Sequence, residues 1–141
     1  MLPTITHSEE ETIELGRLIA RDLPSQAVVL LIGNLGAGKT TLSKGIVSAL
    51  TSTPPEEISS PTFTLIHEYG NGRVYHIDLY RLDTPEQVAT LGLDEIFDRD
   101  AVVLIEWGER FPHLLPEKRF EIRITAKQEE TRHVELRNLT G

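Results

Sequence analysis

The chain has 141 residues, the usual size of one domain and enough for a hydrophobic core without metal or disulfide support. Its formal net charge of −8 disfavours a protein that grips a nucleic-acid backbone by itself, and the lack of cysteine excludes thiolate catalysis. No apolar run approaches the ~20 residues that span a bilayer, and the first residues lack the pattern of a signal peptide. We therefore expect one cytoplasmic domain, residues 1–141, without membrane contact.

The first predicted element is a helix. Ser8 opens a capping box, with an acidic residue three positions later, and the helix should run to about Asp22. Leu15, Leu18 and Ile19 fall on the face that should point inward. Pro24 then ends this helix.

A glycine-rich loop follows between a predicted strand, Val28–Ile32, and a predicted amphipathic helix, Lys39–Leu50. The loop matches G-x-x-x-x-G-K-[ST], the phosphate-binding P-loop pattern. Its glycines let the backbone N–H groups turn inward toward an anion, while Lys39 can reach the outer phosphates and the Thr40 hydroxyl can bind a bridging Mg²⁺. The residues expected at the nucleotide are Gly33, Asn34, Leu35, Gly36, Ala37, Gly38, Lys39, Thr40 and Thr41.

The rest of the chain alternates strands and helices. Strands are predicted over 63–69 and 73–77, joined by a turn, and over 101–105, 120–125 and 133–137. Short helices are predicted from Thr84, with a capping box, to about Gly92 and over 93–97. This pattern predicts an α/β fold, a P-loop NTPase-like domain with a mixed, centrally parallel sheet flanked by helices. The hairpin and the C-terminal strands should be antiparallel.

A P-loop enzyme needs a carboxylate at the end of a neighbouring strand to hold Mg²⁺. Glu106 follows the strongly apolar run 102–105, which favours a central strand beside the P-loop strand. Asp78 follows the less apolar run 74–77. The pattern favours Glu106 but leaves the choice of direct ligand open, because strand order cannot be derived from it.

Other candidate residues have two interpretations each. Thr62 and Thr64 lie where a loop could sense the γ-phosphate, although Ser, Pro and Thr favour turns in any protein. Trp107, the single tryptophan, could stack near the nucleotide or a partner, or pack in the core. The missing N-K-x-D stretch favours ATP over GTP. Two other functions stay open: a small-molecule or nucleoside kinase, for which the chain seems short, and a nucleotide-gated assembly module with incidental hydrolysis.

Five stretches together resemble the TsaE (YjeE) family in order and spacing: residues 36–41, 60–65, 76–82, 91–93 and 105–107. These proteins are the P-loop ATPases of bacterial tRNA threonylcarbamoyladenosine biosynthesis. The Asp-Leu-Tyr-Arg and Glu-Trp segments are far more specific than the P-loop. One departure is Gly108, where many relatives are expected to have proline.

The resemblance implies ATP and Mg²⁺ as cofactors and weak ATP hydrolysis that is switched on with the partner proteins TsaD and TsaB. Those partners transfer threonylcarbamoyl to adenosine 37 of tRNAs that read ANN codons, with TsaC in the same pathway, so tRNA would be met only through the complex. Residue by residue, the resemblance implies that 35–40 hold the phosphates and that Thr40 and Glu106 bind Mg²⁺. Asp78 with Thr62 and Thr64 would assist hydrolysis or sense the γ-phosphate, and Glu9 and Arg132 would lie near the adenosine.

Overall fold

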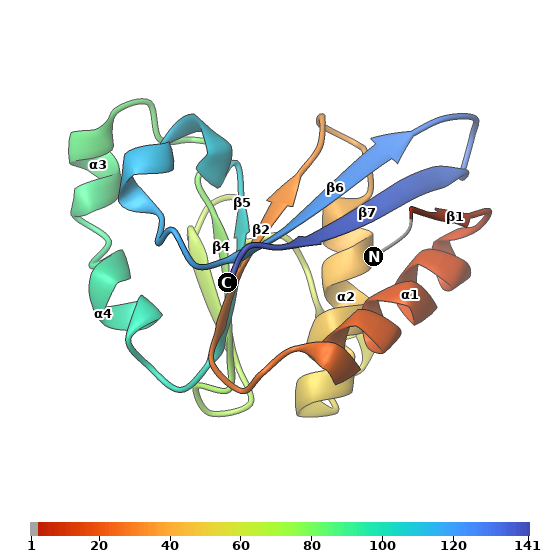
Figure 1. Ribbon diagram of the computed structural model, residues 1–141, viewed down its shortest axis with the longest axis horizontal. Coiled ribbons are helices and arrows are strands. Elements are labelled where there is room, and N and C mark those ends of the chain that lie inside the picture. Colours follow the sequence, from red (N-terminus) through yellow and green to blue (C-terminus); the bar gives the residue numbers. More distant parts are fainter. Residues whose placement is uncertain (1–2) are drawn as a thin grey trace.

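The computed structural model describes residues 3–141, which form one seven-stranded sheet with helices on both faces (Figure 1). Helices α1 (Glu9–Asp22) and α2 (Lys39–Thr51) cover one face, and the short helices α3 (Pro85–Ala89) and α4 (Leu93–Phe97) lie on the other. Single 3-10 turns lie at Pro55–Glu57, Gly108–Arg110 and Pro112–Leu114. The strands are β1 (Thr4–Thr6), β2 (Ala27–Ile32), β3 (Ile66–Tyr69), β4 (Val74–Asp78), β5 (Val102–Glu106), β6 (Phe120–Ala126) and β7 (Arg132–Asn138).

The sheet is mixed and parallel at its centre, which confirms the predicted fold class. Its strand order is β1-β7-β6-β2-β5-β4-β3. Strand β2 is parallel to both β5 and β6, and β4 is parallel to β5, whereas β3, β7 and β1 join their neighbours antiparallel. The prediction of antiparallel C-terminal strands was therefore right for β7. It was incomplete for β6, which is antiparallel to β7 but parallel to β2. The direction of β6 relative to β2 depends on pairing between distant parts of the chain, which no local sequence pattern encodes.

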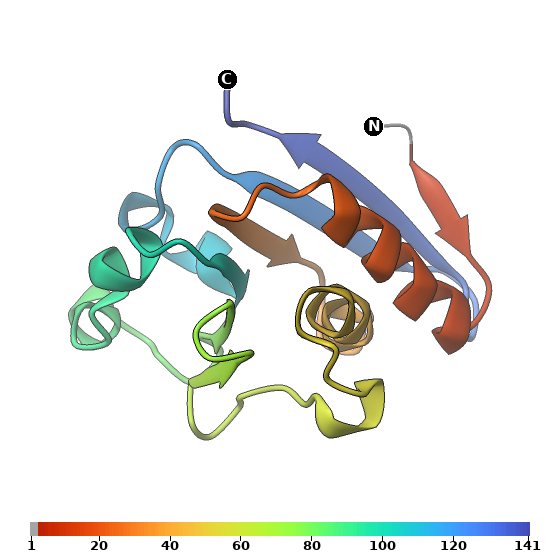
Figure 2. The same cartoon turned by 90° about the horizontal axis from the view of Figure 1, so that it is seen from below.

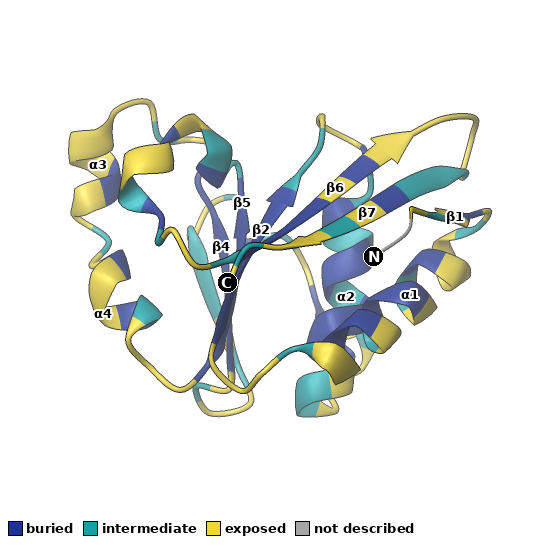
Figure 3. Ribbon diagram, viewed as in Figure 1, coloured by how far each residue is buried: buried dark blue, intermediate teal, exposed yellow. Residues whose placement is uncertain are grey.

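The central strands are buried on both faces, as Figure 3 shows by colour. Val29, Leu31 and Leu104 pack toward α1 and α2 in one core. Leu30 and Ile105 belong to a second core with residues of α3 and α4. Figure 2 shows the two groups of helices on opposite sides of the sheet. Because both faces are covered, β2 and β5 need continuous apolar runs, and these runs made the two strands predictable.

Helix α1 begins where its cap predicted. The Ser8 hydroxyl accepts a hydrogen bond from the Glu11 backbone N–H at 3.1 Å. Leu15 and Ile19 are buried as expected, but Leu18 is 51% exposed, so that assignment was wrong. Leu18 lies at the margin of the buried face, where it lines a shallow groove with Ile5 of the unpredicted strand β1. Within residues 3–141, no helix has both the length and the hydrophobicity to cross a membrane.

The segment before β3 also differs from its prediction. The strand expected over 63–69 starts only at Ile66, because the chain turns over the preceding residues. The Leu65 N–H bonds to the Pro61 carbonyl at 2.8 Å, and Leu65 has a positive φ of 68°. Thr62 and Thr64 therefore lie on a turn rather than in a strand, which suits a loop beside a site.

Candidate functional site

The carboxyl ends of three neighbouring strands position the site. In the sheet register, Glu106 of β5 lies opposite Asp78 of β4 on one side and opposite Leu31 of β2 on the other. Strand β2 then leads directly into the glycine-rich loop. The expectation that the Glu106 strand neighbours the P-loop strand is confirmed, and Asp78 is one strand further away.

A pocket of about 470 Å³ opens over these strand ends. Its walls come from the loop, the start of α2, the turn at residues 60–62, the ends of β4 and β5, and the first turn of α1 together with residues 130–132. The lining residues are Glu9, Thr12, Leu35, Gly36, Gly38, Lys39, Thr40, Thr41, Ser60, Thr62, Asp78, Tyr80, Glu106, Trp107, Glu130 and Arg132. Most of the residues predicted from the sequence thus lie around one cavity.

Four predicted residues lie elsewhere. Gly33, Asn34 and Ala37 line a second pocket of about 310 Å³, to which Trp107 also contributes. Thr64 is exposed and borders neither pocket. The turn at 62–64 explains the difference between the two threonines, because it directs only Thr62 toward the cavity. Their roles stay predictions.

The start of α2 has the features of an anion site. Gly38 precedes the helix with a φ of 107°, a conformation that side chains rarely adopt. No side chain among the described residues caps this end of α2. The first N–H groups of a helix have no partner within it, and here those residues line the pocket. The uncapped end is therefore available to a negatively charged group.

Lys39 is nearly buried and lies folded against the loop. Its ammonium donates to the Gly33 carbonyl at 2.7 Å and lies 3.6 Å from the centroid of the Trp107 ring. Burial lowers the pKa of Lys39, and the carboxylates of Glu106, Glu109 and Asp78 oppose that shift. The ammonium can attract an entering anion, but the three nearby carboxylates repel it, so an anion would be favoured most when it enters together with a cation.

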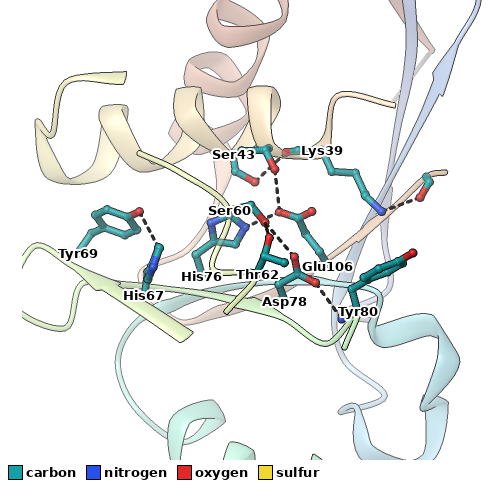
Figure 4. A network of polar contacts seen from close by, with 12 residues as sticks. Lys39, Ser43, Ser60, Thr62, His67, Tyr69, His76, Asp78, Tyr80 and Glu106 are labelled. Atoms are coloured by element: carbon teal, nitrogen blue, oxygen red, sulfur yellow. Dashed lines mark hydrogen bonds and ion pairs between the residues drawn. The ribbon is translucent and has the colours of Figure 1, made fainter. Parts of the chain in front are cut away.

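Glu106 is bonded from two sides by side chains of other elements. Its Oε2 accepts from the Thr40 hydroxyl at 3.4 Å. The same oxygen lies 2.6 Å from Nε2 of His76 (Figure 4). Both His76 and Glu106 are buried. The two groups expected to hold Mg²⁺, Thr40 and Glu106, are thus adjacent. No cluster of three or more His, Cys, Asp or Glu that could hold a metal ion occurs in residues 3–141.

Asp78 ties the turn before β3 to the site. Its Oδ2 accepts from the Ser60 hydroxyl at 2.9 Å, and its Oδ1 accepts from the Tyr80 backbone N–H at 2.9 Å (Figure 4). Thr62 donates in turn to the Ser60 hydroxyl at 3.3 Å. The turn and the strand end therefore form one hydrogen-bonded unit at the wall of the pocket.

Two residues from the ends of the chain complete the wall. Glu9 lies in the first turn of α1, and Arg132 begins β7. Arg132 donates through Nε to the Ala37 carbonyl at 2.8 Å, so it braces the glycine-rich loop from outside. Trp107 is half-buried, with a positive φ of 66°, and its ring lies 5.1 Å from that of Tyr80. It lines the pocket and also packs against the second core.

Sequence reasoning missed several residues of this site, including His76, Ser60 and Tyr80. His76 had a usable signal, because it stands two positions before Asp78 and so must share its face of the strand. Ser60 belonged to the segment already singled out, but its bond to Asp78 depends on the fold of the turn.

Comparison with known proteins gives independent evidence on the family of this chain. A model of the family described as "Threonylcarbamoyl adenosine biosynthesis protein TsaE" matches residues 6–134. The chain belongs to the TsaE family. The match covers every helix and strand from α1 to β6, so the resemblance inferred from the five short stretches is confirmed.

Individual relatives of the TsaE family are similar over most of their length. A protein from a Nostoc species is 42% identical over 91% of this chain and 80% of its own, and one from Bacillus subtilis is 38% identical over 92% and 80%. Both are named tRNA threonylcarbamoyladenosine biosynthesis protein TsaE. A crystal structure of YdiB from Bacillus subtilis superposes with a TM-score of 0.78 at 34% identity, covering 98% of this chain and 85% of that one.

Proposed function

We propose that this TsaE-family chain binds and slowly hydrolyses Mg-ATP, and that this activity supports threonylcarbamoyl modification of adenosine 37 in tRNAs that read ANN codons. It acts with TsaD and TsaB, which carry out the transfer, and in the same pathway as TsaC. The observation that carries the proposal is the juxtaposition of the uncapped start of α2, Lys39 and the Thr40–Glu106 pair around one pocket.

The residues present fit this ligand. Backbone N–H groups at a helix start and a buried lysine suit phosphate oxygens, and a hydroxyl beside a carboxylate suits Mg²⁺, which prefers oxygen ligands. Gly36 has open space where a Cβ would stand, so the loop backbone can approach a phosphate closely. The pocket volume also lies in the range of small-molecule sites.

Each side chain then has a distinct task. Residues 35–40 hold the phosphates, Thr40 and Glu106 hold Mg²⁺, and bound Mg²⁺ would supply positive charge to the phosphate oxygens. Hydrolysis joins a water oxygen to the γ-phosphorus and breaks its bond to the bridging oxygen, which leaves ADP and phosphate. Asp78, held by Ser60, and Thr62 line the same pocket and would assist hydrolysis or sense the γ-phosphate. Glu9 and Arg132 line the same pocket and would lie near the adenosine.

Reconstitution tests the proposal. The chain is combined with TsaC, TsaB, TsaD, threonine, bicarbonate, Mg-ATP and unmodified tRNA, and modified adenosines per tRNA are counted. Wild type should support repeated turnover, whereas Lys39→Ala and omission of the chain should not. Lys44→Ala is the matched control, since Lys44 lies on the same helix but does not line the pocket. Equal modification in all reactions would overturn the proposal.

Two further outcomes identify the other functions. If an Asp78→Ala variant no longer hydrolyses ATP but still supports full modification, the chain is a nucleotide-gated assembly module. Radiolabelled γ-phosphate recovered on a small-molecule acceptor instead of in water would identify a kinase.

A further inference from the structure

A histidine lies where the core should be apolar. His76 is the middle residue of β4, and its side chain is fully buried. On the same face, its neighbours include Val74 and Leu104 of the apolar core. A buried imidazole beside a buried carboxylate need not stabilise a fold. Replacing such a pair with well-packed apolar side chains often leaves the stability unchanged or raises it. The position therefore needs a reason beyond packing.

The hydrogen bond of His76 is directed at one oxygen of Glu106. Nε2 lies 2.6 Å from Oε2, the same oxygen that accepts from Thr40. No group among the described residues donates a hydrogen bond to the other oxygen, Oε1, and Glu106 borders the pocket. The protein thus occupies one carboxylate oxygen and leaves the other for whatever enters the pocket.

The chemistry of the pair fixes the tautomer. An ionised carboxylate can only accept hydrogen bonds, so Nε2 must carry the hydrogen. The other ring nitrogen, Nδ1, is buried and has no hydrogen-bond partner within residues 3–141. The hydrogen bond to Glu106 is then the one polar contact of this ring among the described residues, and it leaves the buried Nδ1 unpaired.

We propose that His76 is a positioning residue that holds the Glu106 carboxylate in one orientation, with Oε2 turned toward α2 and Oε1 presented to the metal ion of Mg-ATP. This inference rests on the proposed function. A carboxylate on a flexible side chain would otherwise rotate, and groups that orient a metal ligand typically change metal affinity or activity 10- to 100-fold when they are removed.

Metal affinity of the nucleotide complex tests this role directly. Mn²⁺ is titrated into the protein with ADP and followed by electron paramagnetic resonance, and ADP affinity is measured separately in EDTA. His76→Leu should weaken Mn²⁺ binding about 10- to 100-fold and leave metal-free ADP binding unchanged. His76→Gln, whose amide nitrogen can replace Nε2 as donor, should recover most of the loss. His67→Gln is the matched control, because His67 contacts Tyr69 outside the pocket.

A second measurement does not depend on a folded leucine variant. Nitrogen-15 spectra of the wild-type protein should show the His76 ring with its hydrogen on Nε2. An Nε2 without hydrogen, or wild-type Mn²⁺ affinity in a folded His76→Leu variant, would overturn the inference. If His76→Leu does not fold, unaltered Mn²⁺ affinity in His76→Asn, whose shorter amide cannot reach as Nε2 does, would also overturn it. Failure of wild type to bind ADP in either condition would overturn the proposed function itself.

Discussion

The ammonium group of Lys39 lies 3.6 Å from the centre of the Trp107 ring, while it also donates to the Gly33 carbonyl at 2.7 Å. Phosphate oxygens arriving at the loop would compete for the same ammonium, because a charge-assisted bond to phosphate is stronger than either contact. Movement of Lys39 away from the ring would then change the surroundings of the single tryptophan. The fluorescence of Trp107 should therefore report phosphate binding.

We predict that Trp107 emission changes on titration with ATP or ADP and that the Lys39→Met variant loses this response. Removing the lysine contact should cost on the order of 1.5–3 kcal/mol of binding, which is about 10- to 150-fold in dissociation constant. Lys44→Met should behave as wild type, since Lys44 does not border the pocket. Unchanged affinity and an unchanged emission response in Lys39→Met would contradict the assignment of the whole site.

Local sequence patterns predict many residues of this site, but not the contacts that bring them together. The loop 33–41 and the acid Glu106 were predictable because each follows an apolar strand within a few residues. The pairing of His76 with Glu106 joins positions 30 apart, and the contact of Arg132 with Ala37 joins positions 95 apart. Both depend on the strand order, which places β5 between β2 and β4 and which follows from burial over the whole sheet. For the same reason, the sequence left the choice between Asp78 and Glu106 open.

The exposure of Leu18 has a similar cause. Helical periodicity correctly selected one face of α1, but the width of its buried stripe depends on what packs against it. Strand β1, with only three residues, gave no recognisable pattern, and Leu18 lines a groove with its Ile5. Short edge strands and the helix margins next to them are thus where local reasoning is weakest.

Glu109 should make the stability of the protein depend on pH. Burial raises its pKa above the usual value, against the opposing charges of Lys39, Arg110 and Arg123, and its Oε1 has no partner among the described residues. The folded protein therefore holds this proton to a higher pH than the unfolded chain does. It follows that the contribution of Glu109 to stability falls as pH rises from about 4.5 through the raised pKa.

We accordingly expect Glu109→Gln to be more stable than wild type at pH 7.5, by about 1 kcal/mol, because it removes the buried charge. Near pH 4 the two proteins should be nearly equal, since Glu109 is then mostly protonated in both the folded and the unfolded state. Urea unfolding at both pH values measures the difference. A gain at pH 4 as large as that at pH 7.5 would show that the effect is not due to ionisation.

The Ser60→Ala variant should loosen the turn before β3. It removes the bond from the Ser60 hydroxyl to Asp78 and leaves Thr62 without its acceptor. We expect a loss of about 1 kcal/mol in stability, faster hydrogen exchange at the Leu65 amide and slower ATP hydrolysis. Ser59→Ala is the control, since this neighbouring serine is exposed. If exchange at Leu65 is the same in both variants, the Ser60–Asp78 bond does not hold the turn.

The contact between α1 and α2 depends on two facing glycines. A Cβ on Gly45 would stand 2.0 Å from the Ile13 carbonyl oxygen and 3.0 Å from the Gly16 Cα, so the backbones approach too closely for any side chain. Gly45→Ala gains about 1 kcal/mol of helix propensity but must separate the helices, at a cost of about 1–3 kcal/mol or more. Because α1 carries Glu9 to the pocket, the variant should also bind ATP more weakly.

Urea unfolding and ATP titration of Gly45→Ala measure both effects, with Lys44→Ala as the control on the adjacent, more exposed position. The control should stay within about 0.5 kcal/mol of wild type. A Gly45→Ala protein as stable as Lys44→Ala would mean that separating the helices costs no more than the roughly 1 kcal/mol gained in helix propensity. Weaker ATP binding in a variant of normal stability would instead show that the position of α1 itself sets the shape of the pocket.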